Sequence, residues 1–456
     1  MRETIKVGVA KANITPAPGG IFHAGDVVAE GVRDELYLKA LVLDDGNERA
    51  AIVTGDLILF GEDTVLQARR RIEELTGIEG EKVMLAASHT HSGPPTTKWL
   101  SEGVSEAYLR ELADKIAGAV YAADSNKREA LIAAGKGEVK LSINRWIMTP
   151  DGAKWGPNPE GPKDDEVCVL RVDDAGGGIM ALLVNYAAHA SVMSWGRHRL
   201  YSGDYPSYLQ STIERIYDGR VVALFTNGAS GDTKIAFLTE DGKDFLYGDW
   251  EDARRYGRMI AAEAVKVAET LKPKPIMGLS VASKVVELPL CEPPSVEDVE
   301  RELRAIEGRM KDLGQKGEEP DWGLKRRLIW AQETLKALKK GDVIRSVPGE
   351  VQVMRLGDDI AFVAVPGELF VEVGLRIKSL CRNVGIGNPF VVAYANVYVG
   401  YLPSARSCRE DGDRPRYDWH KFIPYPSTFS EEVEDVLVGT IEELLKIVRH
   451  TARKRR

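Results

Sequence analysis

KVMLAASHTHSGPP, residues 82–95, begins as a short apolar run and ends abruptly in two histidines followed by glycine and proline. An apolar run of this length, bounded by turn residues, is typical of a buried strand. Five further runs have the same character: AAIVTG (50–55), IMALLVNYA (179–187), RVVALFTNG (220–228), DIAFVAVPG (359–367) and PFVVAYANV (389–397). These runs predict the buried strands of a sheet.

Helix-like segments alternate with these runs. Apolar residues recur at spacings of three and four in EDTVLQARRRIEELTG (62–77), SEAYLRELADKIAGAVYAADS (105–125), YPSYLQSTIERIYDG (205–219) and DARRYGRMIAAEAVKVAETLK (252–272). AGGG (175–178) separates two apolar runs and reads as the turn of a β-hairpin. We therefore predict an α/β fold with mixed, largely buried sheets flanked by helices.

Residues 293–341 differ in character from the rest of the chain. They contain two charged amphipathic segments on either side of GEEPD, which predict an αα-hairpin that extends into solvent. No linker or low-complexity block divides the chain, so residues 1–456 are expected to form a single domain with this hairpin as an insertion.

The composition is that of a soluble globular protein, with 44% hydrophobic and 29% charged residues in 456. A net charge of −8 argues against a nucleic-acid partner. The four cysteines show no CxxC spacing, which disfavours a disulfide framework and a thiolate zinc site. No secretion signal and no run long enough for stable membrane insertion is visible, so we expect a cytoplasmic protein with a small-molecule substrate. A homo-oligomer is compatible with the sequence.

Polar side chains follow the carboxyl ends of five predicted strands, where ligands gather in open α/β sheets. These side chains are His89, His91, His189, Asp232, Glu368, Tyr398 and Tyr401. Imidazole and carboxylate groups together are a common zinc environment. Histidines at i and i+2 of an extended segment share a side, so one can bind a metal while the other contacts substrate or bound water. Taken singly, each residue could instead be a turn, cap or core residue.

Seven segments together resemble the N-terminal catalytic domain of the neutral/alkaline, non-lysosomal ceramidase family. They are KANITP near the start, SHTHSGP (88–94), INR (143–145), YAAHAS (186–191), NGASGD (227–232), VPGE (365–368) and NVYVGYLP (396–403). The resemblance implies a zinc-dependent hydrolase that cleaves the amide bond between a fatty acid and a sphingoid base. It also implies roles for individual residues. The implied zinc ligands are His89, His189, Glu368 and Tyr401, with Tyr398 as the substitute for Tyr401. The implied substrate-site residues are His91 and Arg145, and we also predict that Tyr398 binds the substrate.

The chain departs from the family pattern at one catalytic position. Ceramidases of the family carry a serine in G-D-x-S-P, whereas Lys234 stands at that position in GDTKI (231–235), and Ser230 precedes the pair. We therefore expect a metal-activated water to attack an amide or ester carbonyl. His91 or Asp232 would assist proton transfer, and Arg145 or His91 would stabilise the oxyanion. Lys234 either binds an acidic group of the substrate or is a surface residue, and Thr233 is a less suitable nucleophile.

The resemblance implies that residues 1–456 are a single ceramidase-like metallohydrolase domain and that the family's C-terminal immunoglobulin-like domain is absent. A cytoplasmic protein without the membrane-directed features of the family would meet a two-chain lipid poorly, so we expect a small, polar substrate. SARSCREDGDRPRYDWHKFIPYP (404–426) is either a polar lid or a solvated loop, and Asp204 and His198 could add to the site. Two other functions stay open. One is a glycoside-cleaving hydrolase with paired carboxylates, which needs no metal, and the other is a non-catalytic, zinc-stabilised binding protein.

Overall fold

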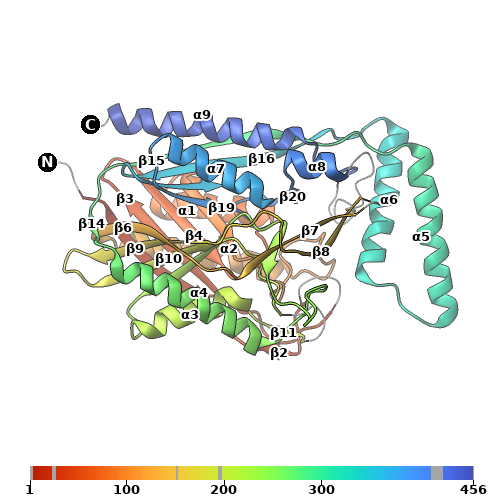
Figure 1. Cartoon of the computed structure of the whole chain (residues 1–456), viewed down its shortest axis with the longest axis horizontal. Coiled ribbons are helices and arrows are strands. Elements are labelled where there is room, and N and C mark those ends of the chain that lie inside the picture. The colour runs from red at the N-terminus through yellow and green to blue at the C-terminus, as the bar shows by residue number, and fades with distance from the viewer. Residues whose placement is uncertain (1–3, 23–26, 150–151, 194–197, 412–424, 455–456) are drawn as a thin grey trace.

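Two stacked β-sheets with helices on both outer faces form the body of the protein (Figure 1). The computed structural model describes residues 4–22, 27–149, 152–193, 198–411 and 425–454. In the large sheet the strands follow the order β12-β10-β9-β6-β1-β3-β4-β5, and β14 pairs with β6. Their bounds are β1 (Lys6–Asn13), β3 (Tyr37–Asp44), β4 (Arg49–Gly55), β5 (Val83–Ala87), β6 (Arg128–Glu138), β9 (Glu166–Asp174), β10 (Ile179–Tyr186), β12 (Val222–Asn227) and β14 (Lys274–Pro275).

The second sheet consists of β15 (Leu279–Pro289), β16 (Ser346–Leu356), β17 (Ile360–Ala364) and β19 (Asn388–Val392), in that order. Pairs β4–β5, β10–β12 and β17–β19 are parallel, whereas β9 and β10 form the predicted antiparallel hairpin. The predicted α/β class with mixed sheets is confirmed. β5 and β10 belong to separate parallel pairs, but the segments that follow them meet directly, because His91 N–H donates to the carbonyl of Ala190 at 3.3 Å.

The alternation of side chains along each strand explains why the two sheets pack together and are covered by helices. On β10, Leu183 faces the second sheet and packs in one core with Phe362 and Phe390, whereas Leu182 and Val184 face the helices. Successive side chains of a strand point to opposite faces, so strands that are apolar throughout must be covered on both sides. The covering helices are α1 (Glu62–Thr76), α2 (Glu106–Ser125), α3 (Asp204–Ile216) and α4 (Trp250–Thr270) on the large sheet, and α7 (Val371–Asn383) and α9 (Glu432–Lys454) on the second.

Four small elements complete the end of the sandwich where the strands terminate. They are a three-stranded sheet of β13 (Thr233–Ile235), β7 (Ser142–Thr149) and β8 (Gly152–Asn158), the parallel pair β18 (Glu368–Leu369) and β20 (Tyr401–Leu402), the parallel pair β2 (Gly31–Val32) and β11 (Leu200–Tyr201), and α8 (Ala405–Asp411). Figure 1 shows β7, β8 and β20 on the right-hand side of the body, away from both chain termini.

The predicted αα-hairpin is present as α5 (Val296–Lys316) and α6 (Trp322–Lys340), which project to the right in Figure 1. The two helices share a small core of their own that includes Val299 and Ala331. The hairpin is also attached to the body, because the indole of Trp322 donates a hydrogen bond of 2.9 Å to the carbonyl of Leu100. The sequence predicted a hairpin that extends into solvent, and it did not predict this contact with the body.

One predicted strand is shorter than expected. The run 389–397 was expected to be extended throughout, yet β19 ends at Val392, and Tyr394 and Asn396 have positive φ values of 54° and 55°. Left-handed backbone is unfavourable for non-glycine residues and is concentrated at functional sites. The irregular segment after β19 is therefore a candidate part of a functional site.

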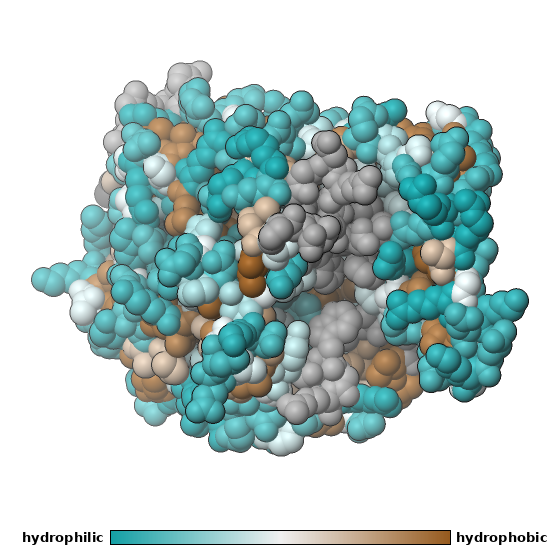
Figure 2. Space-filling model, turned by 45° about the vertical axis from the view of Figure 1, so that its right-hand side comes forward, coloured by the Kyte–Doolittle hydropathy of each residue, from teal (hydrophilic) through white to brown (hydrophobic). Residues whose placement is uncertain are grey.

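No helix among the described residues is long and apolar enough to cross a membrane. The face shown in Figure 2 is mostly hydrophilic, with hydrophobic residues in small separate patches. Most of the proposed lid, residues 412–424 of 404–426, lies outside the described residues.

Candidate metal centre and surrounding site

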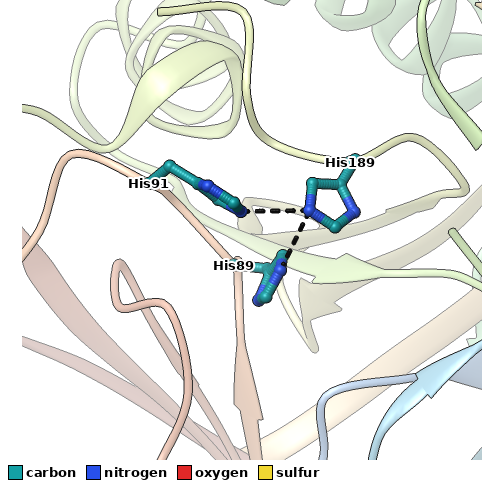
Figure 3. A group of neighbouring side chains, drawn as sticks. All are labelled: His89, His91 and His189. Carbon is teal, nitrogen blue, oxygen red and sulfur yellow. Dashed lines mark hydrogen bonds between the residues drawn. The ribbon is translucent and has the colours of Figure 1, made fainter. Parts of the chain in front are cut away.

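Three histidines meet at the carboxyl ends of β5 and β10. His189 Nε2 lies 3.1 Å from His89 Nε2 and 3.0 Å from His91 Nε2 (Figure 3). One nitrogen from each ring falls within 4.8 Å of the others. Three imidazole nitrogens that face one another so closely form a donor set for a metal ion.

The chain reaches this geometry through a strained turn after β5. His89 has a positive φ of 65°, and its N–H donates to the carbonyl of Leu57 at 2.8 Å. The strand before it is clamped by Asn396, whose Oδ1 accepts from Leu85 N at 3.0 Å and whose N–H donates to Leu85 O at 2.7 Å. These bonds hold His89 in a backbone conformation that the residue would not adopt alone.

A hydrogen bond on the far side of the His89 ring favours a metal-binding tautomer. His89 Nδ1 lies 2.6 Å from the carbonyl oxygen of Ile58, so a proton on Nδ1 leaves the Nε2 lone pair free. His189 Nδ1 lies between a donor and an acceptor, 3.1 Å from Arg145 Nη2 and 3.3 Å from the carbonyl of Ser230. Burial, followed by Arg145 and the two neighbouring histidines, lowers the pKa of His189 well below its usual value. A neutral imidazole is the form that binds a metal.

Glu368, on β18, adds a carboxylate to this cluster. Its Oε2 lies 3.4 Å from His89 Nε2 and 3.7 Å from His189 Nδ1, and its Oε1 accepts a 2.6 Å bond from the Tyr398 hydroxyl. Burial alone would raise the pKa of Glu368, but His89 and Tyr398 hold that pKa below its ordinary value. No donor among the described residues has hydrogen-bond geometry to the buried Oε2. A buried, ionised carboxylate beside two histidines is a suitable ligand for a metal cation.

The spacing of the donor atoms matches a small divalent metal ion. Ligands about 2.0–2.1 Å from a tetrahedral zinc lie about 3.3 Å from one another. The three shortest distances between the histidine and glutamate donors are 3.0, 3.1 and 3.4 Å. The residues present therefore fit a metal ion held by nitrogen and oxygen.

Tyr401 lies beside this donor set because β20 pairs in parallel with β18, opposite Glu368. The Tyr401 hydroxyl contacts Glu368 and lies 3.4 Å from Arg145 Nη2. The family resemblance implies Tyr401 as the fourth ligand and His91 as a substrate-site residue. The structure brings both side chains to the cluster, but His91 is partly exposed, whereas His89 and His189 are buried.

Arg145, on β7, reaches into the same site. Its Nη2 donates to the carbonyl of Gly231 at 2.7 Å and lies 3.1 Å from His189 Nδ1, and its guanidinium stacks on Trp155 at 3.9 Å. The Nε–H is buried and has no hydrogen-bond partner among the described residues. Arg145 is therefore held by its neighbours while it retains donor capacity for a ligand.

Asp232 holds the scaffold together. Its Oδ1 accepts from Val371 N at 2.7 Å, at the start of α7, and its Oδ2 accepts from Asn144 Nδ2 at 2.9 Å. Burial raises the pKa of Asp232 to about 6. Each carboxyl oxygen of Asp232 thus accepts a bond from another element, one from β7 and one from α7.

Lys234, on β13, is not a surface residue, because its side chain is only 5% exposed. Its Nζ lies 4.6 Å from the ring centre of Phe245 and 4.7 Å from that of Tyr247. Burial, with Arg145 as a second cause, lowers the pKa of Lys234 to about 7. Of the two additional candidates, Asp204 is buried at the start of α3, where it accepts from Met193 N, and His198 lies against Trp250.

Tyr394 is a site residue that sequence reasoning missed. Its ring stacks on His89 with centres 4.0 Å apart, and its hydroxyl lies 3.3 Å from His189 Nδ1 and 2.9 Å from Ser230 Oγ. In the sequence Tyr394 is an aromatic residue inside an apolar run, which is typical of a core position. Only the left-handed backbone after β19 turns the ring towards the histidines.

We expect Tyr394→Phe to weaken metal binding by about 10-fold or more, because groups that orient ligating histidines have effects of 10- to 100-fold. The measurement is competition for zinc with a chromophoric chelator. Tyr108→Phe is the matched control, since it also removes a buried hydroxyl, bonded to the carbonyl of Ile14. An equal affinity in both variants and in the unmodified protein would refute the positioning role of Tyr394.

Fold and site together define an α/β protein with a buried candidate metal centre at the carboxyl ends of its strands. The model of the family described as neutral/alkaline non-lysosomal ceramidase, N-terminal, matches residues 5–241, more than half of the chain. The chain therefore belongs to the neutral/alkaline non-lysosomal ceramidase family, a family of hydrolases. The resemblance seen in the sequence is confirmed.

Individual relatives are distant. The chain is 22% identical to neutral ceramidase of Pseudomonas aeruginosa over 451 residues, with 87% of this chain and 66% of the relative covered. It is 27% identical to neutral ceramidase B of Dictyostelium discoideum, with 91% and 69% covered. The chain thus spans about two thirds of the length of these relatives. A crystal structure of the Pseudomonas aeruginosa ceramidase matches with a TM-score of 0.73 at 19% identity, covering 99% of this chain and 75% of that one, which shows a common fold.

Proposed function

We propose that the protein is a zinc-dependent amidohydrolase that cleaves an amide bond, or an ester bond, of a small polar acyl compound in the cytoplasm. The observation that carries this proposal is the convergence of His89, His91 and His189, whose ring nitrogens lie within 4.8 Å of one another. The buried carboxylate of Glu368 lies beside them, 3.4 Å from His89 Nε2. A bound zinc ion would polarise a carbonyl group and lower the pKa of a coordinated water from about 15.7 towards about 7.

We assign the remaining roles by accessibility and free hydrogen-bonding capacity. His89, His189, Glu368 and Tyr401 would hold the zinc, as the resemblance implies. His91 is partly exposed and lies at the same point, so it is suited to hold or deliver a proton at the reacting group. Arg145 has an unused, buried N–H and would donate to the carbonyl oxygen on which negative charge develops.

Of the two predicted proton carriers, His91 and Asp232, Asp232 is the less suitable. Protonation of its carboxyl group would compete with the bonds from Val371 N and Asn144 Nδ2 that it accepts. Its role is therefore to position β7, β13 and the start of α7 around the site. Tyr398, which donates to Glu368, is one bond away from the cluster and can line the substrate side.

Of the two other functions, the glycoside hydrolase gains no support. That mechanism needs two carboxyl groups on either side of the scissile bond. Glu368 is instead surrounded by histidines and tyrosines, and both oxygens of Asp232 are occupied. The binding-protein alternative differs only in turnover.

The test is hydrolysis of a panel of amides and esters by the purified protein with and without a chelator. We expect turnover that falls to background with the chelator and returns when zinc is added back. Turnover that is unaffected in chelator-treated, zinc-free protein would contradict the metallohydrolase. Zinc binding without turnover on any amide or ester would favour the binding protein.

A further inference from the structure

The side chain of Lys234 is on the same face as the candidate metal centre. Lys234 pairs with Ile143 across the β13–β7 ladder and forms a parallel bridge with His189. Residues paired in this way have side chains on one side of the sheet and backbones about 4.8 Å apart. Arg145 is two residues beyond Ile143 on β7 and therefore also lies on this face.

The environment of Lys234 differs from that of other buried lysines. Lys39 is paired with Glu214 at 2.9 Å, and Lys378 with Asp164 at 2.5 Å. Lys234 has the rings of Phe245 and Tyr247 around its ammonium group but no carboxylate within ion-pair distance among the described residues. Withdrawing an ammonium group from water without an anionic partner is unfavourable, and cation–π contacts compensate only in part.

The nearby carboxyl groups are bonded to other parts of the protein, and none of them forms an ion pair with Lys234 among the described residues. Asp232 has both oxygens bonded to Val371 and Asn144, and Asp204 accepts from the backbone N–H groups of Met193 and Tyr205. Arg145 adds a second positive charge on the same face. Lys234 and Arg145 thus place two basic groups on one face of the site, where both can interact with an anionic ligand.

We infer that Lys234, held between Phe245 and Tyr247, binds an anionic group of the substrate, so that the enzyme acts on amides bearing a carboxylate close to the cleaved bond, as N-acyl amino acids do. The hydrolytic part of this inference rests on the proposed function; the anion site does not. The rings restrict the ammonium group, and Phe245 and Tyr247 are themselves partly or largely exposed, so the anion would be bound where the site meets solvent.

The experiment compares matched anionic and neutral compounds on the zinc-loaded protein. Release of benzoate from N-benzoylglycine and from N-benzoylglycinamide gives the ratio of the two kcat/KM values. Calorimetric titration with benzoylpropionate and its neutral amide, in which a methylene group replaces the scissile nitrogen, gives the same comparison for binding without turnover.

We expect the carboxylate to be preferred by roughly 10- to 100-fold in both measurements, the range for a hydrogen bond to a charged group. Lys234→Met fills a similar volume between the rings and should reduce the preference to below about 3-fold, whereas Lys234→Arg should retain part of it. Lys243→Gln, an exposed lysine of the same segment, is the control and should keep the full preference.

The outcomes separate the two proposals. Preferential binding of benzoylpropionate that Lys234→Met abolishes, without hydrolysis of either amide, supports the anion site and counts against the hydrolase. Hydrolysis or binding with equal efficiency for the charged and neutral compounds overturns the anion site and leaves the hydrolase standing. A preference that persists in folded Lys234→Met also overturns it.

Discussion

Glu368→Gln is expected to lose stoichiometric zinc and to lower kcat/KM by about 1,000-fold or more. The amide carries no negative charge beside His89 and His189, where Glu368 Oε2 lies. Oε1 accepts a hydrogen bond from Tyr398 and Oε2 would bind the metal, so the amide would place an N–H donor at a position that requires an acceptor. Elemental analysis of the purified variant and kinetics on the best substrate of the panel measure the two effects. His89→Ala should behave in the same way.

Glu350→Gln is the matched control for this variant. Glu350 is a largely buried glutamate on β16 that is paired with Arg69 at 2.7 Å, outside the metal centre. It should retain about one zinc per chain even if the lost ion pair lowers the melting temperature. Full zinc content in a folded Glu368→Gln protein would exclude Glu368 as a ligand and would remove the basis of the proposed mechanism.

His91→Ala is expected to keep its zinc while turnover falls by about 100- to 10,000-fold, the contribution of a positioned acid or base. The reason is its partial exposure and its place in the proposed site as a proton carrier, with Tyr401 as the fourth ligand. The measurements are zinc content, melting temperature and the pH profile of kcat/KM. The pH profile of the residual activity should lack the limb that His91 causes as a general acid or base.

His198→Ala is the control, because His198 lies against Trp250 and not in the cluster. If His91→Ala loses zinc while Tyr401→Phe retains it, the three histidines and Glu368 form the metal shell, and the assignment of Tyr401 is wrong. The structure makes this comparison necessary, since His91 Nε2 is as close to His189 as His89 Nε2 is.

Local pattern was enough to predict much of the fold. The runs that became β4, β5, β10, β12 and β17, the helices α1 to α4 and the α5–α6 hairpin were placed within a few residues of their observed bounds. Each is long or apolar enough for its own periodicity to be read. The central strand β1 was not predicted, because KVGVAKAN places lysines among short apolar residues, and its position between β6 and β3 comes from pairing with distant segments.

The candidate site was only partly predictable for a related reason. His89, His91, His189 and Glu368 could be grouped because each follows an apolar strand, and ligands of open α/β sheets gather at the carboxyl ends of strands. The roles of Tyr394 and Asp232 could not be assigned in this way. Tyr394 reaches His89 through left-handed backbone, and Asp232 meets its partners Val371 and Asn144 across 139 and 88 positions of sequence.

The sequence by itself determined the α/β class, the family and the residues that could bind a metal, because these depend on local periodicity and on motifs of adjacent residues. Tertiary structure alone decided that three histidine nitrogens meet within 4.8 Å, that Asp232 is fully occupied and that Lys234 is buried between two rings. These features depend on contacts between segments distant in the chain, and on the burial that such contacts create, which no local pattern specifies.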